Sequence, residues 1–303
     1  MDDETIMVNG KTPWPVDETV DVNGQRRWHT YHGEATILSG DLKHPLKQQI
    51  KPQTNVKLSH KGGYLSEHAE PYRLEGLISF DRAYTQTAGN RDHDKEGHGW
   101  NTLVTSVIEG LNVLEVVTAD RVVGQIATHH PLEGYVPSVH FLGTRFENLR
   151  IAGHPVRVDM HPDPYFFGPK PDNDGGYTRH DGILSRIREQ FDRIRSADGL
   201  PADLRARYNE SPLQSDGLKE SMECSLVSQV EAPAFGRSFG HVIDIPDFGK
   251  IYLALLRVEH SDYKGDVPKK TTFDLTMIKL ALGCSAAGSG SLGNTVVGGG
   301  TEP

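Results

Sequence analysis

Histidine and carboxylate side chains gather in one polar loop, residues 88–99. The loop reads Ala-Gly-Asn-Arg-Asp-His-Asp-Lys-Glu-Gly-His-Gly and carries Asp92, His93, Asp94 and His98. Imidazole and carboxylate groups are suitable ligands for a divalent metal ion. The glycines of the loop, however, leave its backbone too free to hold such ligands rigidly without support. The sequence therefore favours a solvated loop without metal or cofactor, and these four residues are the alternative metal ligands.

Motifs that identify common enzyme classes are missing. There is no Gly-x-x-x-x-Gly-Lys-Ser/Thr phosphate loop, no Gly-x-Ser-x-Gly elbow, no His-Glu-x-x-His pair, and no Gly-x-Gly-x-x-Gly between a strand and a helix. The two cysteines, Cys224 and Cys284, are too few for a disulfide framework, and we expect both to be reduced and structural. We predict no catalytic residues, and the sequence argues against an enzyme.

The elements that would position these residues are strands. Val, Ile and Thr dominate the stretch from Thr102 to Val158, and branched side chains fit a pleated, half-buried surface better than a helix. Between residues 113 and 127, apolar residues occupy both odd-numbered and even-numbered positions. This pattern predicts either a strand covered on both faces or a bulge that switches faces near Asp120.

We predict a mainly β fold, an antiparallel sandwich or partly closed barrel, with a small helical insertion at about 181–209. The first helix of the insertion would carry its apolar residues on one face. Three parts are expected along the chain. Residues 1–71 form a turn-rich segment with short strands, residues 72–284 form a single β domain around the insertion, and residues 285–303 form a Gly/Ser-rich tail that is flexible or lies along an edge.

Charge and hydropathy narrow the possible partners. The formal net charge is −9, and no run of basic residues is longer than two, which argues against nucleic-acid binding. No window approaches the roughly 18 consecutive apolar residues of a membrane span. The acidic stretch from Met1 to Met7 lacks the apolar core of a secretion signal. We expect a cytoplasmic protein if Met1 is the native start, and an exported one if a leader was removed.

Two segments within residues 106–158 resemble a known group of proteins. They read Val-Ile-Glu-Gly-Leu-Asn-Val-Leu-Glu-Val-Val-Thr-Ala-Asp-Arg-Val and Phe-Leu-Gly-Thr-Arg-Phe-Glu-Asn-Leu-Arg-Ile-Ala-Gly-His-Pro-Val. They are similar to bacterial surface β domains of the choice-of-anchor type, over about a sixth of the chain. The resemblance implies a binding or structural role and brings no catalytic residues with it.

We therefore expect a non-enzymatic β-scaffold that assembles with itself or binds a partner. Open sheet edges and apolar faces recruit neighbours, so a homo-oligomer formed through sheet edges or faces is the expected partner state. A cupin-like metal- or ligand-binding barrel with the 88–99 loop at its mouth is the alternative. A glycan-binding module that uses exposed aromatic residues is a second alternative.

Overall fold

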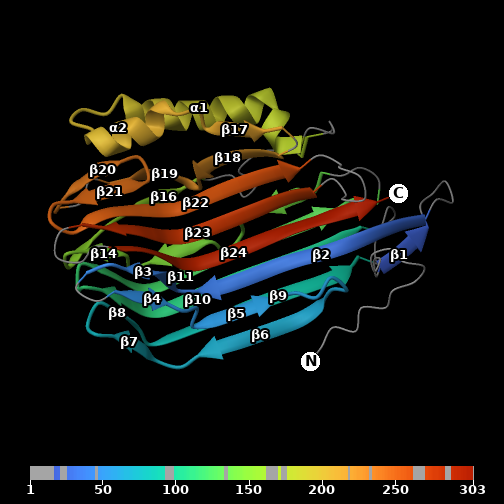
Figure 1. Ribbon diagram of the computed structural model, residues 1–303, viewed down its shortest axis with the longest axis horizontal. Coiled ribbons are helices and arrows are strands. Elements are labelled where there is room, and N and C mark those ends of the chain that lie inside the picture. Colours follow the sequence, from blue (N-terminus) through green and yellow to red (C-terminus); the bar gives the residue numbers. More distant parts are fainter. Residues whose placement is uncertain are drawn as a thin grey trace.

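The computed structural model describes residues 17–20, 26–44, 47–92, 99–132, 136–161, 170–171, 176–217, 219–231, 234–261, 270–283 and 288–302. Figure 1 shows long strands that run in one general direction across the molecule, with the helices at one margin. The mainly β fold with a small helical insertion is thereby confirmed. No helix in the described part of the chain is long and apolar enough to span a membrane.

The larger sheet has twelve strands, and all of its pairings are antiparallel. Its central order is β1-β2-β24-β23-β22-β18-β17. Its members are β1 (Asp17–Val20), β2 (Arg26–Ile37), β3 (Ser39–Leu42), β4 (Gln48–Ile50), β5 (Thr54–Lys57), β17 (Leu213–Asp216), β18 (Lys219–Ser225), β20 (Arg237–Phe239), β21 (Val242–Ile245), β22 (Gly249–Ser261), β23 (Lys270–Leu282) and β24 (Gly288–Glu302).

The smaller sheet has ten strands, and β10 and β11 form its centre. Its members are β6 (Gly63–Ala69), β7 (Tyr72–Leu74), β8 (Ile78–Phe80), β9 (Arg82–Arg91), β10 (Trp100–Val113), β11 (Val117–His130), β12 (Ser138–His140), β13 (Arg145–Glu147), β14 (Arg150–Ile151) and β15 (His154–Pro155). A separate pair joins β16 (Val158–Met160) to β19 (Val227–Val230).

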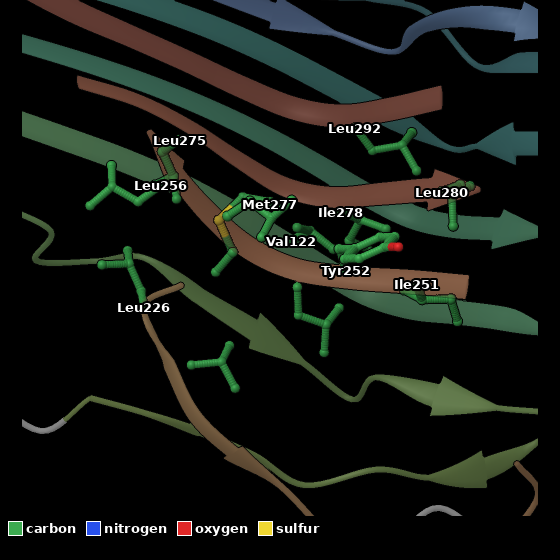
Figure 2. Packing of buried hydrophobic residues seen from close by; sticks show 14 of the residues in the cluster. Val122, Leu226, Ile251, Tyr252, Leu256, Leu275, Met277, Ile278, Leu280 and Leu292 are labelled. Carbon is green, nitrogen blue, oxygen red and sulfur yellow. The ribbon is translucent and has the colours of Figure 1, made fainter. Parts of the chain in front are cut away.

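The two sheets pack face to face as a sandwich, with β2, β24 and β23 over β9, β10 and β11. Both are open sheets among the described strands. Figure 2 shows apolar side chains of β23, among them Leu275 and Met277, gathered with Val122 of β11. These three side chains are at most 1% exposed. Glycines bring the sheets close together, because a Cβ atom on Gly124 would lie 2.9 Å from Met277 Cγ.

The predicted change of face near Asp120 is present in the β10–β11 pair. In β11 the buried residues are odd-numbered up to Ala119 and mainly even-numbered from Val122 onward. The ladder is interrupted opposite, at Gly110, which has a φ of +66°. A side chain is also excluded there, since a Cβ on Gly110 would lie 2.1 Å from the Asp81 carboxylate. Gly110 therefore allows the strand to turn its other face to the core.

The helical insertion consists of α1 (Asp181–Arg195) and α2 (Ala202–Asn209), preceded by a short 3-10 helix, η1 (Gly176–Arg179). The insertion lies beside β17 and β18 (Figure 1). His180 caps α1, and its side chain accepts a hydrogen bond from the Ile183 N–H. Every apolar residue predicted to share one face of α1 is buried: Ile183, Leu184, Ile187, Phe191 and Ile194.

The structure differs from the sequence prediction at both ends of the chain. Residues 288–302, expected as a tail or an edge segment, form β24, which pairs with β23 on one side and with β2 on the other. Strand β2 comes from the part expected to be turn-rich, and its twelve residues lie inside the larger sheet. The twelve-stranded sheet thus contains segments from all three predicted parts.

Candidate functional site: the edge strand β6

The loop predicted as the alternative metal site is described only at its base. The Asp92 N–H donates to the Gly99 carbonyl at 2.9 Å, which closes the connection between β9 and β10. His93, Asp94 and His98 lie outside the described residues. Among the residues that are described, no three His, Cys, Asp or Glu side chains come close enough to hold a metal ion.

A cluster of histidine and aromatic rings lies inside the sandwich at one end of β10 and β11. The ring of His29 stacks on Trp100 with centroids 4.9 Å apart, and lies 4.6 Å from the ring of His130. Tyr31 meets His29 edge-on at 4.7 Å. Burial lowers the pKa of His29 to about 2 and that of His130 to about 3, with a further contribution from a neighbouring histidine in each case. Both rings are therefore neutral at physiological pH, and the cluster is enclosed packing.

A small cleft of about 140 Å³ lies where α2 meets β17, β18 and β22. Charges of both signs line it, and Arg207 forms an ion pair with Glu223. The Arg207 guanidinium also lies over the Tyr252 ring at 5.1 Å. These contacts fix Arg207 as a link between the helical insertion and the sheet. The only described cysteine, Cys224, is buried nearby, and burial raises the pKa of its thiol.

Strand β6 is the exception among the sheet edges. Every other described strand that pairs on one side only has four residues or fewer. Strand β6 has seven, pairs with β9 over its whole length, and has no partner on its other side among the described strands. Figure 1 shows it at the lower margin of the molecule. Short edge strands are one way in which proteins prevent unwanted pairing. Strand β6 lacks this protection.

The side chains of β6 are exposed, and two of them are large and hydrophobic. Six of the seven residues are exposed, and the exposed fractions are 63% for Tyr64 and 44% for Leu65. Among the described residues, the other large exposed hydrophobic side chains belong to Leu142 and Phe235, which lie in a turn and a bend outside the strands. An exposed strand edge with apolar side chains is a surface on which another strand can add.

The neighbouring edge strand β5 is blocked by a residue of β6. The Glu67 carboxylate accepts a hydrogen bond of 2.8 Å from the Asn55 N–H of β5. This contact occupies a backbone donor of β5 and engages the only formal charge on β6. The ring of His68 lies 5.8 Å from that of Tyr84 on β9. The open hydrogen-bonding edge is therefore that of β6.

Sequence reasoning did not find this site because its main signal is missing. A half-buried strand alternates apolar and polar residues, whereas a strand exposed on both faces has no such alternation by which it can be recognised. Residues 63–69 accordingly fell within the segment expected to be turn-rich. The Tyr64-Leu65 pair, between a double glycine and Pro71, is the local signal that was available.

Comparison with known proteins gives one match. A family model described as "Domain of unknown function (DUF8256)" matches residues 29–259. Searches among curated proteins and among solved structures returned no match. The matched range includes all of β6, the histidine and aromatic cluster and the helical insertion.

Proposed function

The chain belongs to the DUF8256 family, and we propose that it is a non-enzymatic β-scaffold that assembles with other copies of itself through the edge of β6. The observation that carries the proposal is the length of this unpaired edge, seven residues, when the other described edge strands have four or fewer. Strand addition satisfies the free N–H and C=O groups of an edge and covers its apolar side chains.

The surroundings of β6 favour assembly over a purely protective role. Natural edges are commonly defended by lysine, proline or an inward-pointing charge. Strand β6 contains neither lysine nor proline. Its one charged residue, Glu67, points toward β5 of the larger sheet, where the Asn55 N–H binds the carboxylate and leaves the edge itself uncharged. Tyr64 and Leu65 remain available to a partner strand.

The experiment is a measurement of molar mass by light scattering on a size-exclusion column over a range of micromolar concentrations. We expect masses above the 33.5 kDa of one chain, rising with concentration. Leu65→Glu adds a second carboxylate to each edge, two residues from Glu67, so two paired β6 strands would repel each other and the protein should return to a monomer. Leu142→Glu is the matched control, because Leu142 is 61% exposed but lies in a turn outside β6.

The control should associate like the unsubstituted protein, and both variants should unfold cooperatively at similar temperatures because each replaces an exposed residue. A monomer at every concentration would refute the proposed function. Equal association of the Leu65→Glu and Leu142→Glu variants would also refute it.

A further inference from the structure

We infer that the β6 edge pairs with the β6 edge of a second copy in an antiparallel, two-fold arrangement centred on Ser66. This inference rests on the proposed function and specifies its geometry. A two-fold axis requires the same residue of each copy to lie at the centre of the pairing. Only a centre at Ser66 uses the whole strand from Gly63 to Ala69.

The side chains fit this register. Residues whose numbers sum to 132 lie opposite each other, so Tyr64 of one copy faces His68 of the other. Tyr64 is 63% exposed in the single chain, and His68 already lies beside the Tyr84 ring. Pairing would therefore cover Tyr64 with two rings of the other copy. Cross-strand aromatic pairs of this kind stabilise antiparallel sheets.

The charges also permit a second copy as the partner. Two chains of formal charge −9 repel each other as whole molecules. Along β6, however, Glu67 is the only formally charged side chain, and it would face Leu65 of the other copy instead of Glu67. Its carboxylate is also held by the Asn55 N–H. No carboxylate is placed directly opposite another.

The arrangement is closed. Each β6 pairs with β9 on one side and has one edge without a partner among the described strands. Pairing of the two free edges consumes both, so the assembly stops at two chains, and the two smaller sheets join into one continuous sheet. A seven-residue pairing is small beside a standard interface of about 1,600 Å². We therefore expect a reversible monomer–dimer equilibrium.

Cysteine substitutions test the register directly. Ser66→Cys places two thiols opposite each other across the axis, within the Cα separation of about 4.4–6.8 Å that a disulfide requires. Under mild oxidation at micromolar concentration we expect a disulfide-linked dimer. Ser215→Cys is the matched control, because Ser215 is also exposed and lies on the short edge strand β17. The unsubstituted protein, oxidised in the same way, shows how much dimer forms through the native cysteines.

A mixing experiment supplies the second arm. Tyr64→Cys alone should not link, because its two copies would lie four positions apart along the strand, or about 13 Å at 3.3 Å per residue. An equimolar mixture of Tyr64→Cys and His68→Cys should link at least tenfold faster than either alone. Failure of both linkages in a protein that still associates would overturn the register and leave the proposed function standing. A protein that does not associate would overturn both.

Discussion

At the scale of single residues, Asp274 stands out because its carboxyl group is placed unfavourably. It lies on β23 between Arg257 of β22 and Val296 of β24 in the ladder, and its Oδ1 is buried without a hydrogen-bond partner in the described part of the chain. Burial raises the pKa of this carboxyl to about 6, against a hydrogen bond from Asn294 that lowers it. The folded protein therefore binds a proton more tightly than the unfolded chain.

The raised pKa of Asp274 predicts that a neutral residue at this position stabilises the protein. A raised carboxyl pKa stabilises the fold below the unfolded value of 3.8, and that contribution is lost as the pH rises through about 6. Asp274→Asn should therefore increase the free energy of unfolding at pH 8 by about 1–3 kcal/mol, with no gain near pH 4. Asp216→Asn, on the exposed β17, should change it by less than about 0.5 kcal/mol. Denaturant titrations at the two pH values measure both; a loss of stability at pH 8 would show that the carboxylate is needed.

At the scale of elements, β24 joins two parts of the larger sheet. It pairs with β2 from Trp28 to Thr36 and with β23 from Thr271 to Leu282. Its removal would leave the two long strands β2 and β23 with open edges inside the sandwich. We expect a chain that ends at Gly283 to lose cooperative unfolding and to aggregate.

A synthetic peptide of residues 284–303 provides the control for this truncation. If β24 acts as a strand that fills a fixed place, the peptide added during refolding should restore cooperative unfolding and the native circular dichroism. A peptide of the same composition in scrambled order should not. A truncated chain that folds cooperatively without the peptide would contradict the central role of β24.

Elements with a regular apolar pattern were predictable from the sequence, and those without one were not. Strands β10 and β11 and helix α1 bury alternating or helically spaced apolar residues, so periodicity revealed them. Strand β24 reads Gly-Ser-Gly-Ser-Leu-Gly at its start, and glycine carries no side chain from which a pattern can be read. Its glycines have a packing role, because a Cβ on Gly299 would lie 2.9 Å from His29 Cε1 and 3.1 Å from His130 Cε1.

The candidate site was beyond sequence reasoning for a related reason. Sheet-edge position is a property of the whole topology, and the residues 63–69 carry no mark of which strand lies beside them. The meeting of His29 with His130 likewise depends on the packing of two sheets. The polar loop with His93 and His98 was visible because its residues are adjacent in sequence, and its metal content stays a prediction.

At the scale of the whole molecule, buried histidines make the stability depend on pH. Burial lowers the pKa of His130 and His241 to about 3, and that of His29 to about 2, against 6.5 for the unfolded chain. The unfolded chain thus binds more protons below pH 6.5, and stability is lost as the pH falls through this range. Between pH 7 and pH 5, each of these histidines lowers the free energy of unfolding by about 2 kcal/mol. The raised pKa of Asp274 acts in the opposite direction and offsets a smaller part of this loss.

We therefore expect the free energy of unfolding to fall by several kcal/mol from pH 7 to pH 5 at constant ionic strength. Denaturant titrations measure this slope. His241→Phe should make the free energy of unfolding depend less on pH, by the contribution of one histidine. This holds even if the variant is less stable at every pH because it lacks the 2.9 Å hydrogen bond to Tyr208. A stability that stays constant between pH 7 and pH 5 would be incompatible with neutral, enclosed histidines.

The position of β24 also has a consequence for synthesis of the protein on the ribosome. Strand β2 leaves the ribosome long before β24, its partner over nine residue pairs, which ends at Glu302. The larger sheet therefore cannot be completed until more than 260 further residues have been made. At about 5–20 residues per second, this wait lasts on the order of 10–50 s. Throughout that interval the nascent chain exposes the long edge of β2, so its yield in the cell should depend on chaperones that shield unpaired strands.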